Sequence, residues 1–443
     1  MRRLLFTILG MVCLVASASG QATAPTLNQA ELVKSLLERI DKLEKRVDEL
    51  ESKQACPSGT CALKASVMTA SAVDPPLLPA QEVPAPRSAT QAASQDHEHA
   101  LSTQEQATTF PSLQIRGFGD VDFSAKNQPG IHSGFDLGQF TLHITSQLSR
   151  KVSYFGEATF TARPSAYELQ VERSIVRYDY NDFFKLSFGK YHTPINYWNT
   201  AFHHGLWLQT TISRPEMIQF GGIFLPVHFL GLLGEGEIPS GPVGLNYQLG
   251  LGNGRDDNIA RAGDSGAINN HRAWVMNVFA RPSRAQALQV GASLYGDEIT
   301  SGILPRTQEL ISSAHIVWVR ETPEFLAEFA NVHHFVPQSG QTFNSQAYYV
   351  QVAYRLPVFE KKWKPYYRFE HIHIPMGDPI FCCFETTILQ TAVPGFPSLM
   401  ESTAGVRYDI TDFAAFKGEY RNFHFGPNQP WFNGVFVQTA FTF

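Results

Sequence analysis

Charged side chains at every second position are the residues of this chain that could act on other molecules. Arg116, Asp120 and Asp122 share one parity, while Val121 and Phe123 occupy the other. This is the period of a β-strand with one polar and one apolar face. Such a polar face can hold or guide ions and polar solutes through its charges. The candidate functional residues on these faces are Arg116, Asp120, Asp122, Glu157, Arg173, Arg177, Lys185, Arg368, Glu370, Arg407, Lys417 and Arg421. The alternative interpretation is that they form structural ion pairs.

Motifs for catalysis are missing from the sequence. We find no GxSxG, HExxH, P-loop or GxGxxG motif in a suitable context, so we expect no enzymatic activity and no cofactor. Histidine pairs could bind a metal only if distant loops converged, and the run Asp96–His99 has the composition of a solvated polar segment. We therefore predict no metal site. The histidine pairs are His203/His204, His333/His334 and His371/His373.

The N-terminus has the pattern of a secretory signal. Arg2 and Arg3 precede an apolar stretch, and the small residues Ala18, Ser19 and Gly20 end it, which predicts a signal peptide over residues 1–20. The formal net charge is −5, and it falls to −7 without the two arginines. A net acidic chain argues against a nucleic-acid partner.

Residues 27–53 are predicted to form a short coiled coil because apolar residues recur there in heptads. The seams consist of Val33, Ile40 and Val47 and of Leu36, Leu43 and Leu50. β-branched residues at the first position favour two strands, whereas the additional Leu32 and Leu37 widen the seam toward three. Self-association is expected, because an isolated helix of this length is marginal in water. The alternative is a lone amphipathic helix that lies on the rest of its own chain.

Residues 54–110 have the composition of a disordered linker, rich in Pro, Ala, Ser and Thr. Two cysteine pairs remain after signal cleavage, in a compartment that permits disulfides. We expect Cys56 and Cys61 to close a small loop. For Cys382 and Cys383, a vicinal disulfide and pairing across loops both stay open.

From residue 111 to the C-terminus the alternation predicts an all-β domain. No apolar segment after the signal is long enough for a spanning helix, since Gly221–Leu233 is short and contains Pro226 and His228. If the domain enters a membrane, it does so as an antiparallel β-barrel, and tight turns alternate with long segments as such barrels require. We predict sixteen strands, at 113–125, 136–149, 152–163, 167–180, 183–192, 226–235, 242–253, 271–281, 286–297, 309–321, 324–335, 343–357, 363–374, 400–411, 413–425 and 432–443.

Three stretches carry a family resemblance. Arg173–Trp198 reads RSIVRYDYNDFFKLSFGKYHTPINYW, Asn246–Gly254 reads NYQLGLGNG, and Gly405–Tyr408 reads GVRY. They resemble the porin O/P family, the phosphate-selective type of Gram-negative outer-membrane porin. The terminal Phe443, after an alternating strand, resembles the recognition segment of proteins inserted into the bacterial outer membrane. The resemblance implies a sixteen-stranded trimeric barrel in the outer membrane, with a constricting loop folded inward. In some relatives a periplasmic N-terminal coiled coil precedes the barrel.

The resemblance predicts a porin, a passive diffusion channel for small polar or anionic solutes. Its expected partners are outer-membrane lipid, small polar solutes or inorganic anions, and two further copies in a homotrimer. We expect residues 192–225 to form the constriction, and Arg173, Arg177 and Lys185 to form a basic stripe beside it. Phosphate specificity is not expected, because 25 of the 35 Lys and Arg lie from Phe110 onward, against 28 of the 40 Asp and Glu. The alternative function is a structural anchor in the outer membrane that tethers the cell wall through the coiled coil.

Overall fold

The computed structural model describes Lys45 and the residues 110–163, 166–202, 204–220, 224–255, 259, 269–300, 304–381, 398–426 and 429–443. The predicted signal peptide, the linker except Phe110, both cysteine pairs and all of the predicted coiled coil except Lys45 lie outside these residues. They stay predictions.

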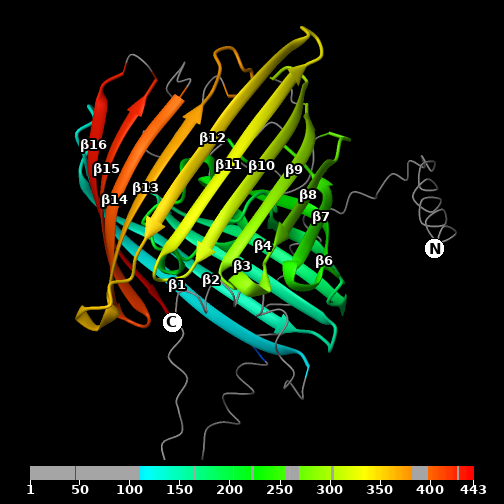
Figure 1. Cartoon of the computed structure of the whole chain (residues 1–443), viewed down its shortest axis with the longest axis horizontal. Helices are drawn as coiled ribbons and strands as arrows, with labels where there is room; N and C mark the ends of the chain where they lie inside the picture. Colours follow the sequence, from blue (N-terminus) through cyan, green and yellow to red (C-terminus); the bar gives the residue numbers. More distant parts are fainter. Residues whose placement is uncertain are drawn as a thin grey trace, which may run out of the picture. The chain divides into compact units, whose positions relative to one another are not determined.

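Sixteen antiparallel strands form one closed barrel, which confirms the predicted fold class (Figure 1). Each strand pairs with its neighbours in the sequence, and β1 pairs with β16 to close the barrel. Every predicted strand corresponds to an observed one, with ends that differ by a few residues. The strands are β1 (Ser112–Lys126), β2 (Gly134–Gln147), β3 (Val152–Arg163), β4 (Ala166–Asn181), β5 (Phe184–His192), β6 (His228–Ile238), β7 (Leu245–Asn253), β8 (Ala273–Ala280), β9 (Leu288–Ile299), β10 (Thr307–Val319), β11 (Glu324–Val336), β12 (Gln341–Ala353), β13 (Trp363–His373), β14 (Ser398–Thr411), β15 (Ala414–Phe425) and β16 (Trp431–Thr442).

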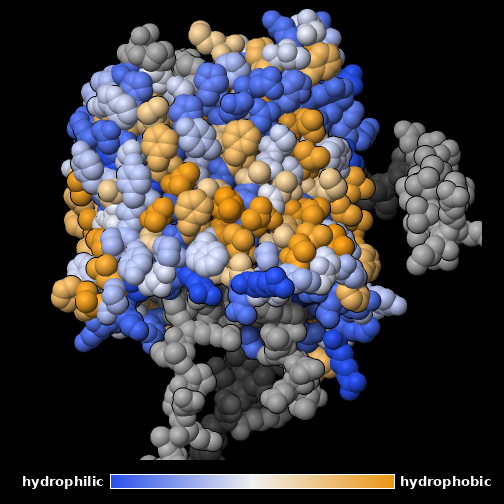
Figure 2. Space-filling view, in the orientation of Figure 1, coloured by the Kyte–Doolittle hydropathy of each residue, from blue (hydrophilic) through white to orange (hydrophobic). Residues whose placement is uncertain are grey.

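The two faces of the barrel wall follow the alternation in the sequence. Val121 on β1 points outward and is 42% exposed, whereas its neighbour Asp120 points inward and is 5% exposed. Figure 2 shows that hydrophobic residues gather in a band across the face of the barrel in view, with hydrophilic residues toward both ends. Polar side chains of the wall are therefore enclosed in the barrel interior, and apolar side chains face outward.

Short connections gather at one end of the barrel, here called the short-turn end. They include η3 (Gly241–Val243), η5 (Ser283–Ala285) and η6 (Phe359–Lys361). The longest connections, β5 to β6, β7 to β8 and β13 to β14, lie at the opposite, long-loop end, together with the short turns from β3 to β4 and from β11 to β12. The chain also ends at the short-turn end. There Gly117 and Phe443 exchange two backbone hydrogen bonds, of 2.9 and 3.0 Å. A Cβ atom on Gly117 would meet the end of the Phe443 ring, so a larger residue there would displace this exposed side chain.

One β-bulge changes which side chains face inward. Glu157 on β3 pairs with Arg173 on β4, but the next residue, Ala158, pairs with Val171. The extra residue, Glu172, therefore lies on the same face as Arg173. Glu172 is 3% exposed, and it enters the interior although strict alternation would place it outside.

The segment between β5 and β6 contains three short helices, α4 (Trp198–Ala201), η1 (Leu206–Leu208) and η2 (Glu216–Ile218). Among the described residues, no helix is both long enough and apolar enough to cross a membrane.

Candidate channel interior

The described residues of 193–227, the segment that connects β5 to β6, fold into the barrel, as predicted for 192–225. Trp198 is fully buried, and Trp207 packs in one cluster with Phe118 of β1. The base of the segment is held closed by Asn199, whose amide donates to the carbonyls of Thr193 at 2.8 Å and Val227 at 3.0 Å. Sequence length alone indicated that this connection was too long for a hairpin loop. That it narrows a solute path stays a prediction.

Three predicted basic residues on the barrel wall hold the carbonyl groups of this segment. Arg407 on β14 donates to the carbonyls of Trp207 at 2.8 Å and Gln209 at 2.9 Å. On β15, the ammonium of Lys417 donates to the Thr211 carbonyl at 3.0 Å. The third cation, Arg368 on β13, reaches Ser213. A segment without regular secondary structure leaves its carbonyls without partners, and these side chains satisfy them with charge-assisted bonds.

Carboxylates on the same wall satisfy the N–H groups of the segment. Glu370 accepts from the Glu216 N–H at 2.6 Å, and Glu419 accepts from the Ile212 N–H at 2.7 Å. Further along, Glu328 on β11 accepts from the Tyr197 N–H at 3.0 Å. Acidic and basic side chains thus alternate along one side of the interior and fasten both kinds of backbone group. The predicted residue Arg421 joins this set through Glu419, to which its Nε donates at 2.8 Å.

On the opposite wall, acids and bases pair with each other. The Nε of Arg173 donates to Glu157 at 2.7 Å, and the His143 ring lies 3.5 Å from the same carboxyl group. Glu172, which the bulge turns toward the interior, lies 3.5 Å from His204 of the inward segment and 3.1 Å from His228. The two predicted residues Glu157 and Arg173 are therefore brought into contact.

Nearer the short-turn end, Arg177 lies between two carboxylates. Its guanidinium is 2.8 Å from Asp179 and 3.7 Å from Glu235. Lys185 is partly exposed and lies opposite Glu235 in the register of β5 and β6. The three cations of the predicted basic stripe therefore share this wall, and carboxylates lie beside Arg173 and Arg177.

The remaining predicted residues lie on β1. Asp120 accepts from the Gln139 N–H at 3.2 Å, and Asp122 accepts from the Gln438 amide at 2.9 Å. Arg116 shares their parity but lies closer to the short-turn end, where it is exposed. It is not brought together with the residues that fasten the inward segment.

A separate group of charges lies at the short-turn end of β11 and β13. Lys364 lies 2.8 Å from Glu324 and 3.1 Å from Glu321, and the Nε of Arg355 donates to Glu321 at 2.9 Å. Burial by itself would raise the pKa of the Glu321 carboxyl group. The positive charges of Lys364 and Arg355 outweigh that effect and hold its pKa below the ordinary value.

Part of the interior is apolar. Leu326 and Tyr349 point inward and are almost fully buried, and they pack in one cluster with Trp198, Phe224 and Phe381. The side of the interior formed by β8 to β13 is thus a packed protein core. The inward segment adheres to it through apolar contacts as well as through charges.

Several interior residues were missed by sequence reasoning. Glu324, Glu328 and Lys364 follow the same parity as their neighbours on β11 and β13, and a complete listing of inward positions would have found them. Glu172 could not be found in this way, because the bulge that turns it inward leaves no distinct residue pattern.

No protein-family model and no curated protein sequence matches the chain. Solved structures do match its fold. They include an anion-selective porin from Comamonas acidovorans, with a TM-score of 0.53 and 12% identity over 75% of this chain and 100% of that one.

Two other solved structures match the fold with similar TM-scores and similarly low sequence identity. The outer-membrane channel DcaP of Acinetobacter baumannii gives a TM-score of 0.52 at 12% identity, over 76% of this chain and 99% of that one. OmpF of Salmonella typhi, in complex with daunomycin, gives a TM-score of 0.51 at 11% identity, over 75% of this chain and 98% of that one. The described barrel therefore has the fold of the sixteen-stranded outer-membrane porins.

Proposed function

We propose that this chain is a passive diffusion channel of the Gram-negative outer membrane, for small polar or anionic solutes. The observation that carries the proposal is a closed barrel with an apolar band outside and charged side chains inside, crossed by an inward segment that those charges fasten. Apolar residues facing outward suit the hydrocarbon of a bilayer, and enclosed charges suit a path for polar solutes.

The solute path runs along β1 to β4 in this proposal. The inward faces of β8 to β13 are occupied by the apolar cluster and by the anchors of residues 193–227. By contrast Gln139, Thr161 and Gln170, which point inward from β2, β3 and β4, are only partly buried. A path between this wall and the inward segment passes Asp122 and Arg173, whose opposite charges would orient dipolar solutes.

We further infer that the chain is a porin O/P type channel and forms a homotrimer. The sequence resemblance at Arg173–Trp198 supports the family, and the heptads in residues 27–53 support self-association on the periplasmic side. Ile40→Asp with Leu43→Asp places charges in the predicted seam. It should lower the temperature at which the detergent-solubilised oligomer dissociates, and an unchanged temperature would mean that the barrels associate without the coiled coil.

Planar-bilayer recording of the purified, folded protein tests the proposed channel. We expect stepwise ion conductance, together with liposome permeability to sugars that falls with their size. Protein whose folded state is established by its heat-dependent gel mobility, and which carries no current, would contradict the proposal.

A further inference from the structure

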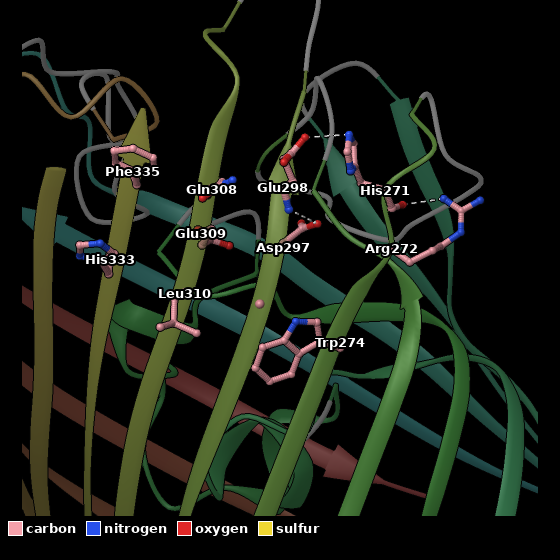
Figure 3. A pocket seen from close by; sticks show the side chains of 11 residues that line it. His271, Arg272, Trp274, Asp297, Glu298, Gln308, Glu309, Leu310, His333 and Phe335 are labelled. Atoms are coloured by element: carbon pink, nitrogen blue, oxygen red, sulfur yellow. Dashed lines mark hydrogen bonds and ion pairs between the residues drawn. The ribbon is translucent and has the colours of Figure 1, made fainter. Parts of the chain in front are cut away.

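The outer surface of the barrel has a hollow over β8 to β11, close to the long-loop end (Figure 3). It has a volume of about 520 Å³. One row of outward positions crosses these four strands, and its members are Trp274, Gly296, Leu310 and His333. Because Gly296 has no side chain, the row is interrupted in its middle, and the Trp274 indole lies across the glycine.

The floor of the hollow is apolar. Trp274 and Leu310 are 42% and 43% exposed, so both present apolar surface to whatever surrounds the barrel. Leu251 continues the same row on β7 and is 55% exposed. The hollow therefore opens into the outward apolar band.

The rim above this floor is charged, with positive charge in excess. Among the described residues, Glu298 is the carboxylate of the rim; it is partly buried, and both His271 and Arg306 lie 2.7 Å from it. A further cation, Arg272, donates to the backbone carbonyl of His271 at 2.6 Å and is exposed. The described part of the rim therefore carries two arginines and a histidine against one carboxylate.

The other two acids near the hollow do not cancel this excess, because they point into the barrel. Asp297 accepts from the Arg255 N–H at 2.6 Å and from the Tyr295 hydroxyl at 3.1 Å. Glu309 lies 3.2 Å from the Arg255 guanidinium and 2.9 Å from His334, and all three side chains are fully buried. Glu309 is paired with Arg255 and His334 inside the barrel, and Asp297 is held there by hydrogen bonds.

We propose that this hollow binds a lipid with an anionic, phosphorylated headgroup. Its acyl chain would lie on Trp274 and Leu310, and its phosphate would lie at Arg272 and Arg306. The order of polarity on the wall, apolar below and cationic above, matches the order in such a lipid. A second copy of the chain fits less well, because apolar side chains elsewhere on the barrel are more exposed than Trp274 and Leu310. Phe135 is 81% exposed, and Tyr167 is 76% exposed.

This inference rests on the proposed membrane location of the barrel but not on its conductance. Brominated acyl chains quench tryptophan at short range, so lipids that carry them report contact with Trp274. The contribution of Trp274 is obtained as the difference between the full-length protein and Trp274→Phe. We expect brominated phosphatidylglycerol to quench it at lower concentration than brominated phosphatidylcholine. A basic residue near an anionic headgroup contributes roughly a fivefold preference.

Arg272→Gln with Arg306→Gln should abolish the preference for phosphatidylglycerol. The matched control, Arg284→Gln with Arg320→Gln, removes two exposed arginines from the short-turn end and should retain it. Equal quenching by the two lipids would overturn the inference. A preference for phosphatidylglycerol that survives in the Arg272→Gln, Arg306→Gln variant would overturn it as well. Quenching by neither lipid in an oligomeric sample would also overturn it and would identify this face as a protein contact. A folded barrel that lacks conductance but keeps the lipid preference would contradict only the proposed channel.

Discussion

Arg368 of β13 holds Ser213 of the inward segment through two hydrogen bonds, of 2.8 Å from Nη1 to the backbone carbonyl and 2.7 Å from Nη2 to the hydroxyl. The two residues are far apart in the sequence: Arg368 lies on β13, and Ser213 lies in the connection between β5 and β6. Arg368 is 1% exposed, so its charge is compensated by these contacts and by Glu370, 2.9 Å away. The side chain thus positions the segment as much as it contributes charge to the interior.

Arg368→Gln should loosen the inward segment. A hydrogen bond to a charged group contributes about 1.5–3 kcal/mol, and glutamine cannot reproduce the two-pronged contact. We expect a higher and noisier single-channel conductance in planar bilayers. Arg355→Gln is the control, because it removes an arginine that pairs with Glu321 and Asp409 at the short-turn end. Equal current noise in both variants would mean that Arg368 does not restrain the segment.

Deleting residues 199–209 should widen the path. The deletion removes η1 and the two carbonyls that Arg407 holds, so this guanidinium would become accessible to ions. Both the conductance and the preference for anions should increase. The measurement requires protein shown to be folded by its gel mobility. A conductance equal to that of the unmodified protein would place the constriction outside residues 193–227.

Replacing Arg173, Arg177 and Lys185 together with Gln should shift the reversal potential toward cations. The replacement leaves Glu157, Asp179 and Glu235 without the cations beside them, so local charge becomes negative. The shift should be larger at 0.1 M salt than at 1 M, since the Debye length falls from about 10 Å to about 3 Å. A reversal potential that does not move would show that permeating ions do not sense these side chains.

His334→Gln should destabilise the barrel, whereas His333→Gln should not. The His334 ring lies between two buried carboxylates, 2.9 Å from Glu309 and 2.8 Å from Asp378. Removing one partner of a buried ion pair costs about 3–5 kcal/mol. The adjacent His333 points outward and contacts Asn344, so it is a matched control. Urea unfolding of the two purified variants would measure the difference, and equal midpoints would contradict the prediction.

The sequence by itself determined the barrel and its strands. Alternation of polar and apolar residues specifies which face of each strand is buried, and a shift of one residue would reverse every side chain, so the pattern carries strong information. The same alternation correctly placed Asp120, Glu157, Arg368 and Lys417 on the inward face. The chain length between β5 and β6, together with Trp198, Trp207 and Arg214, predicted a segment folded into the interior.

Only the tertiary structure decided what the inward charges contact. Lys417 meets Thr211, and Glu328 meets the N–H of Tyr197, because the inward segment crosses the barrel at one height and in one orientation. That path depends on apolar packing around Trp198 and on a bulge that turns Glu172 inward. Neither the packing nor the bulge produces a periodic residue pattern that could be recognised in a single sequence. Contacts between distant residues arise from how the closed wall and the segment pack together, and local alternation contains no record of that packing.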